Sequence, residues 1–129
     1  MVIDTSALVA VFLAEPERKQ FLNLILEAEK RLISAATVLE TGIVLEAKRG
    51  EAAGREFDLF VVRAQLEIVP VDAEQVEIAR SAWRKFGKGR HAAGLNFGDC
   101  FAYALAASFG EKLLAKGQDF SFTDVEICH

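Results

Sequence analysis

The chain has 129 residues, 52% of them hydrophobic, and a formal net charge of −4. This length predicts one domain with a substantial core, and the hydrophobic content excludes a disordered chain. The negative charge excludes a general nucleic-acid coat protein, so contact with nucleic acid requires a local basic patch. The two cysteines form no disulfide pattern, and no apolar run is long enough to cross a membrane. We therefore predict a cytoplasmic protein without a membrane segment.

Short apolar runs alternate with segments of helical spacing. Buried strands are predicted at residues 2–3, 31–34, 66–71 and 112–115, with a further edge strand at 125–127. Two helices are predicted between each pair of successive buried strands, at 8–13, 16–29, 35–49, 51–64, 72–86 and 98–109. Pro16 suits a first helical turn, Ser34 and Asp72 suit N-caps, and Gly50 and Gly110 suit helix ends.

The order of these elements predicts an α/β fold. One strand followed by two helices occurs three times in succession, and a fourth strand completes the series. This order favours a central parallel sheet of about four to five strands with helices on both faces. Side chains at the carboxyl ends of parallel strands meet at one edge of the sheet, so a functional site is expected there.

Four acidic residues fall at positions that this fold brings to that edge. Asp4 follows the first strand, and Glu40 lies inside the helix after the second. Asp99 begins the last helix, and Asp119 follows the strand at 112–115. A cluster of carboxylates without histidine or cysteine suits hard divalent cations such as Mg²⁺ or Mn²⁺.

Most of these acids also have a structural explanation. Asp4 and Asp99 suit the first turn of a helix, where the dipole favours a carboxylate, and Asp119 follows a glycine in a turn. Glu40 differs, because its helical neighbours are apolar and a buried charge requires a partner. No single acid decides the question, but the set of four favours a metal site.

Four parts of the chain together resemble the PIN-domain ribonucleases, and specifically the VapC toxins of bacterial VapBC toxin–antitoxin pairs. These parts are residues 2–8, Glu40, 95–106 and 117–120. The resemblance covers the whole chain, and the Asn-Phe-Gly-Asp-Cys stretch at 96–100 is its most specific piece. It implies a single PIN-like domain over residues 1–129, a homodimer, and a VapB-type antitoxin whose C-terminal segment covers the active site.

The resemblance also implies roles for the acids. It makes Asp4, Glu40 and Asp99 metal ligands, and Asp119 matches a fourth acid that often follows Asn in the family but follows Gln118 here. The implied activity is a metal-dependent endoribonuclease, in which Mg²⁺ or Mn²⁺ activates a water that hydrolyses an RNA phosphodiester. Carboxylates that converge in this way are expected to raise one another's pKa by like-charge repulsion.

Hydroxyl and basic side chains suggest supporting roles. Thr5 and Ser6 are placed to orient the carboxylate of their neighbour in sequence or a bound water. Lys88, Arg90 and His91 lie on a glycine-bounded loop, and we interpret them as contacts to the RNA backbone on a mobile flap.

Two other functions remain open from the residues alone. A phospho-accepting receiver-like domain would use Asp4, Asp72 and Lys116, but it leaves Glu40 and Asp99 without a role. A catalytically inactive PIN-fold binding module would keep the fold alone, and it gives no reason to retain four acids at these positions.

Overall fold

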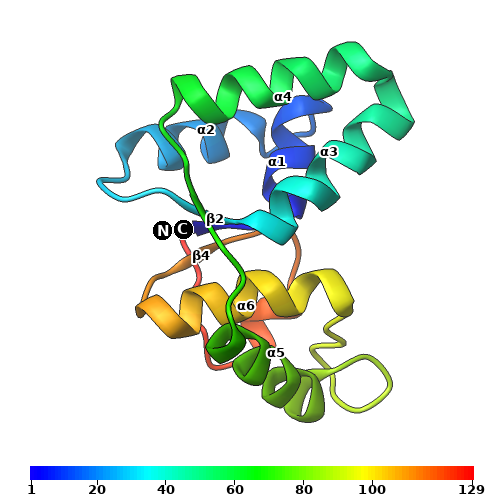
Figure 1. Ribbon diagram of the computed structural model, residues 1–129, viewed down its shortest axis with the longest axis vertical. Coiled ribbons are helices and arrows are strands. Elements are labelled where there is room, and N and C mark those ends of the chain that lie inside the picture. The colour runs from blue at the N-terminus through cyan, green and yellow to red at the C-terminus, as the bar shows by residue number, and fades with distance from the viewer.

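A computed structural model describes all residues, 1–129, and its elements follow the predicted order. They are β1 (Val2–Ile3), α1 (Thr5–Phe12), α2 (Arg18–Glu27), β2 (Leu32–Ser34), α3 (Ala35–Arg49), α4 (Glu51–Arg63), β3 (Glu67–Val69), α5 (Ala73–Phe86), α6 (Phe97–Phe109), β4 (Leu113–Leu114) and the 3-10 helix η1 (Asp119–Phe122). Helices α1 to α4 cover one face of the sheet, and α5 and α6 cover the other (Figure 1). The predicted α/β class is therefore confirmed.

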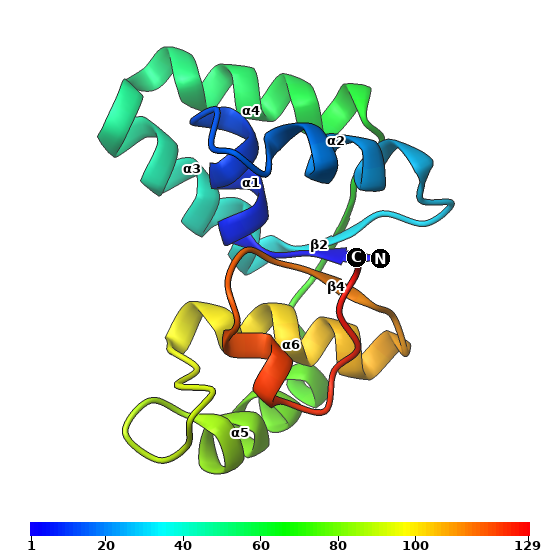
Figure 2. The same ribbon diagram turned by 180° about the vertical axis from the view of Figure 1, so that it is seen from behind.

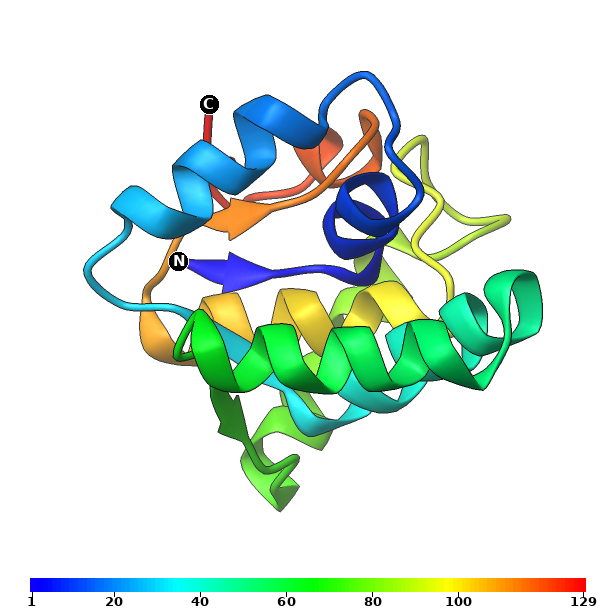
Figure 3. The same ribbon diagram turned by 90° about the horizontal axis from the view of Figure 1, so that it is seen from above.

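The sheet is four-stranded and entirely parallel, in the order β3-β2-β1-β4. Seen from above, β1 and β4 run side by side in the same direction (Figure 3). The chain adds β2 and β3 on one side of β1 and then places β4 on the other side. The order therefore reverses between β1 and β4, and such a switch point is where open parallel sheets bind ligands.

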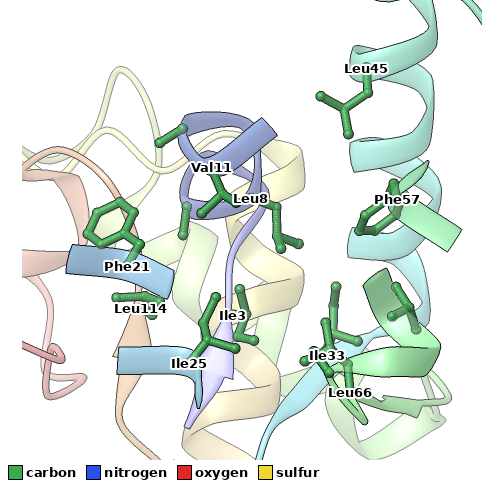
Figure 4. Packing of buried hydrophobic residues seen from close by; sticks show 14 residues of the cluster. Ile3, Leu8, Val11, Phe21, Ile25, Ile33, Leu45, Phe57, Leu66 and Leu114 are labelled. Carbon is green, nitrogen blue, oxygen red and sulfur yellow. The ribbon is translucent and has the colours of Figure 1, made fainter. Parts of the chain in front are cut away.

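Alternation along the short strands explains why both faces of the sheet are covered. Successive side chains of a strand point to opposite faces, and every residue of β1, β2 and β4 is buried. One core, shown in Figure 4, contains Ile3, Ile33 and Leu114 together with side chains of α1 to α4. The other core contains Val2, Leu32 and Leu113 together with side chains of α5 and α6.

Local capping residues fix most of the helix boundaries. Ser34 accepts a hydrogen bond from Ala36 N (3.3 Å) at the start of α3, and Asp72 accepts one from Gln75 N (2.9 Å) at the start of α5. Gly50 ends α3 with φ 83°, a conformation that a side chain disfavours. These three boundaries agree with the sequence-based prediction.

Two predicted helix starts and one predicted strand were wrong. The first helix begins at Thr5 rather than residue 8, because Asp4 caps it directly after β1. The second begins at Arg18 rather than Pro16, because Ala14 at φ 53° turns the chain before the helix forms. The segment 125–127 contributes one isolated bridge from Ile127 to Leu113 and no strand. No helix combines the length and the apolar character that spanning a membrane demands.

Candidate active site

The carboxyl-end edge of the sheet gathers the four predicted acids from the segments that follow β1, β2 and β4 and from the start of α6. Asp4 directly follows β1, Glu40 lies in the second turn of α3 after β2, and Asp119 begins η1 after β4. Asp99 lies in the first turn of α6, which packs beneath β1 and β2 (Figure 2). The charges of Asp4, Asp119 and Glu40 all act on Asp99, so the four acids share one electrostatic environment.

Asp4 is the most deeply buried of the four, with 3% of its surface exposed. Its Oδ2 accepts hydrogen bonds from Ser6 N (3.0 Å) and Ser6 Oγ (2.7 Å). Burial raises the pKa of Asp4 above its usual range, the bonds from Ser6 oppose that rise, and the charge of Glu40 adds to it. Ser6 Oγ also accepts a bond from Lys116 N (2.9 Å), so Ser6 ties Asp4 to the chain that leaves β4.

Glu40 is oriented by a chain of two threonines. Thr5 Oγ1 donates to Glu40 Oε1 (2.6 Å), and the buried Thr41 donates to Thr5 Oγ1 (3.2 Å). The Glu40 carboxylate lies directly against Gly98, where a Cβ atom would overlap it. Glycine at this position therefore lets the acid of α3 reach the start of α6, beside Asp99.

Asp99 belongs to a capping box at the start of α6. Its Oδ2 accepts a hydrogen bond from Asn96 N (3.0 Å), and Asn96 Oδ1 accepts one from Asp99 N (2.9 Å). Burial, and then the charges of Asp4, Asp119 and Glu40, raise the pKa of Asp99 to about 6, although the bond from Asn96 lowers it. Burial is thus the largest cause, and the repulsion between carboxylates that the sequence led us to expect adds to it.

Asp119 is exposed at the rim of the site. The neighbouring Phe120 is buried and anchors η1, and Tyr103 of α6 donates a hydrogen bond to Asp124 (2.5 Å) farther along the chain. These contacts fix the backbone that carries Asp119 at the rim of the site.

The carboxylates face local donors rather than a common centre. No three His, Cys, Asp or Glu side chains are grouped closely enough in this arrangement to hold a metal ion together. Like charges at short range repel, so each acid takes the nearest donor: Ser6 for Asp4, Thr5 for Glu40 and Asn96 for Asp99. Holding one cation together would require these carboxylates to turn away from their present donors.

The basic loop between α5 and α6 stands out from the body of the protein beside both helices (Figure 2). Lys88 is exposed, and the guanidinium of Arg90 lies over the ring of Trp83, 4.3 Å from its centroid. His91 Nδ1 accepts a hydrogen bond from Ala93 N (3.0 Å), and its ring meets Phe86 edge-on. His91 therefore already has a structural role within the loop, and the predicted RNA contacts remain predictions.

Sequence reasoning missed two residues that complete the site. Gly98 and Thr41 matter only through contacts with residues far away in the sequence, namely Glu40 and Thr5. The sequence carries one usable signal, a glycine in the first turn of a helix directly before an acid, because glycine there lowers helix stability without a packing reason. The hydroxyl of Thr41 carries no such signal.

A PIN-domain family model matches residues 1–126. The chain is 51% identical over 129 residues to Ribonuclease VapC of Mycolicibacterium smegmatis, covering 100% of both proteins. It is 52% identical over 125 residues to Ribonuclease VapC30 of Mycobacterium tuberculosis, covering 97% of this chain and 95% of that one. The chain belongs to the VapC ribonucleases of the PIN-domain family.

Two solved structures share this fold. The crystal structure of VapC20 from Mycobacterium tuberculosis, a Sarcin-Ricin loop cleaving toxin, matches with a TM-score of 0.75 at 21% identity, over 97% of this chain and 98% of that one. VapBC2 from Rickettsia felis, bound to a DNA fragment from its promoter, matches with a TM-score of 0.76 at 14% identity, over 98% and 96%. The receiver-like alternative is not favoured, and its Asp72 serves as the exposed N-cap of α5.

Proposed function

We propose that this VapC ribonuclease is a metal-dependent endoribonuclease toxin whose Asp4, Glu40, Asp99 and Asp119 hold Mg²⁺ or Mn²⁺. The observation that carries the proposal is the convergence of charge on Asp99, whose pKa of about 6 reflects the three other acids as well as burial. A folded chain retains such an arrangement at a cost, because buried carboxylates destabilise the protein when ionised. A divalent cation offsets that cost.

The donor set fits a hard cation. All four side chains offer oxygen alone, the chemistry that Mg²⁺ and Mn²⁺ prefer. The space that Gly98 leaves open lets the carboxylate of Glu40 approach Asp99, as a shared ligand set requires. Thr5 and Ser6 hold Glu40 and Asp4 from behind, in the manner of outer partners that orient metal ligands.

The reaction follows from the residue types. A divalent cation bound here would supply an activated water and stabilise negative charge on a phosphate. The protein's own hydroxyl groups orient the carboxylates that would bind the cation. Ser6 keeps one oxygen of Asp4 fixed, and the Thr41–Thr5 chain keeps one oxygen of Glu40 fixed. At neutral pH Asp99, with its pKa of about 6, is mostly ionised and therefore ready to bind a cation.

Cleavage of RNA by the purified protein tests the proposal. Mg²⁺ or Mn²⁺ should support cleavage, EDTA should abolish it, and Asp4→Ala and Asp99→Ala should lack it in any metal. Asp72→Ala, at an exposed helix N-cap away from the four acids, is the matched control and should cleave normally. Full activity in EDTA would exclude the metal, and cleavage by neither metal would support an inactive binding module.

We further propose that a VapB-type antitoxin neutralises this chain and that the chain acts as a homodimer. Solved neighbours of the fold include VapBC2 and a toxin–antitoxin complex from Klebsiella pneumoniae. A concentrated set of carboxylates attracts a basic side chain of a partner, and arginine binds carboxylates through two parallel hydrogen bonds. Expression of the chain alone should slow growth, and co-expression of its antitoxin should relieve the effect. Harmless expression of an active enzyme would contradict the toxin assignment.

A further inference from the structure

An apolar groove of about 680 Å³ lies between α5 and α6, immediately beside the proposed metal site. Its volume falls within the roughly 300–1,000 Å³ of sites that bind small organic groups. Nine residues line it, six of them apolar and three of them arginines, and no acid is among them. The residues that matter here are Arg80, Trp83, Arg84, Arg90, Phe97 and Phe101.

The groove adjoins the acids through α6. Phe97 and Cys100 line the groove and lie within the same helical turn as Asp99. A polymer that presents a phosphate to the acids therefore passes the mouth of this groove with its neighbouring units. We propose that the groove binds unstacked nucleobases of the RNA strand next to the cleaved phosphate, an inference that rests on the proposed ribonuclease function.

Aromatic exposure is the first observation that carries this inference. Phe97 is 81% exposed and Trp83 is 42% exposed. The rings of Phe97 and Phe101 meet in an edge-to-face arrangement with centroids 5.0 Å apart, and most of the Phe97 side chain remains in contact with solvent. Large exposed aromatic rings cost free energy in water unless they bind a partner. Proteins that bind single-stranded RNA use such rings to stack bases.

Charge is the second observation. The chain carries a net charge of −4, yet the groove gathers Arg80, Arg84 and Arg90 without an acid. The Arg90 guanidinium lies over the ring of Trp83, and bases stack on guanidinium planes as well as on aromatic rings. An occupant with flat apolar surfaces and negative charge complements this lining, and single-stranded RNA has both.

The same charges disfavour a second copy of the chain in this groove. In a twofold dimer, the same surface patch of each subunit contacts its counterpart. Three arginines from each copy would then meet across the axis without a carboxylate in the lining to neutralise them. The groove is therefore assigned to an anionic ligand.

Fluorescence of Trp83 provides a direct test, because it is the only tryptophan of the chain. In EDTA, where the proposed cleavage does not occur, a mixed-sequence single-stranded RNA should quench Trp83. An abasic ribose-phosphate chain of the same length should bind without quenching. Phe97→Ala should weaken binding of the base-containing RNA by about tenfold, and it should leave binding of the abasic chain unchanged.

Two further variants separate stacking from other effects. Phe97→Leu keeps an apolar side chain but removes the ring, so it should behave like Phe97→Ala. Phe109→Ala removes a less exposed aromatic side chain at the opposite end of the same helix, where Phe109 lies under Lys30, and should bind RNA normally. A Phe97→Ala protein that binds RNA as tightly as the wild type would overturn the assignment.

Other outcomes also decide whether the groove binds nucleobases. Equal quenching by the abasic chain would show that phosphate contact alone is responsible. Quenching by an acidic, apolar peptide but not by RNA would assign the groove to the antitoxin, and quenching that rises with protein concentration alone would assign it to a second copy. Each of these results overturns the inference. Metal-dependent cleavage is measured separately, so base-dependent quenching without cleavage would contradict the proposed enzyme and not the groove.

Discussion

Replacing Asp99 by Asn should stabilise the metal-free protein at neutral pH while removing activity. The folded-state pKa of Asp99, about 6, is higher than its ordinary value of 3.8, so the folded protein binds this proton more tightly than the unfolded chain does. The contribution of Asp99 to stability is therefore fully present below pH 3.8 and is lost as the pH rises through about 6. Asn is uncharged at every pH, so the Asp99→Asn protein does not lose this stability as the pH rises.

The magnitude follows from the difference between the two pKa values. A rise in pKa from 3.8 to about 6 corresponds to a free energy of about 3 kcal/mol for a fully buried group. Asp99 is only partly buried, and solvent screens its charge, so we expect about 1 kcal/mol. For a chain of 129 residues, this free energy raises Tm by about 4 °C. Asn also accepts the hydrogen bond from Asn96 N, so the helix cap is retained.

Thermal unfolding in EDTA, followed by circular dichroism at about pH 7.5 and again near pH 4, measures the effect. Asp99→Asn should melt higher at the upper pH, and the difference should shrink at the lower pH. Asp72→Asn, the same change at the exposed N-cap of α5, should show no such pH dependence. Saturating Mn²⁺ should reverse the order, because the wild type gains more binding energy. Equal melting temperatures for wild type and Asp99→Asn at neutral pH would refute the raised pKa of Asp99.

Three further substitutions probe the site. Gly98→Ala should displace Glu40 and lower cleavage by about tenfold or more, while thermal unfolding shows unchanged or higher stability. Gly42→Ala, whose added Cβ would have only a contact of 3.9 Å to Glu46, is its control and should cleave normally. Ser6→Ala should lower stability by about 0.5–1.5 kcal/mol in denaturant titrations, because the hydrogen bond from Ser6 Oγ to Asp4 is lost, and should weaken Mn²⁺ binding. Replacing Lys88 and Arg90 together by Gln should flatten the salt dependence of RNA binding by about one unit of slope per lost contact, without changing metal affinity.

Local signals made much of the fold predictable. Ser34, Gly50 and Asp72 act on backbone groups a few residues away, so the sequence itself contains their effect. The alternation of strands with helix pairs likewise depends on local apolar spacing. Pro16 was misleading because the turn at Ala14 sets where α2 begins, and that conformation is not encoded by a proline signal.

The acids themselves were predictable, but their environment was not. Asp4 and Asp99 stand at a strand end and a helix start, Glu40 lies in the second turn of the helix after β2, and a parallel sheet brings such segments together. The hydrogen bond from Thr5 to Glu40 and the approach of Gly98 join residues that are distant in the chain. Burial is the largest cause of the raised pKa values of Asp4 and Asp99, and burial depends on packing that no local pattern reports.

Binding of Mn²⁺ to the purified protein, measured by calorimetry, tests the central claim most directly. The four carboxylates are proposed to share one cation site. Each of three variants, Asp4→Asn, Glu40→Gln and Asp99→Asn, should therefore weaken Mn²⁺ binding at that site. Asp119→Asn should weaken it to a smaller extent, because this acid lies at the rim. Asp72→Asn should bind as the wild type does. Unaltered Mn²⁺ affinity in Asp4→Asn and Asp99→Asn proteins would show that these carboxylates do not form a metal site.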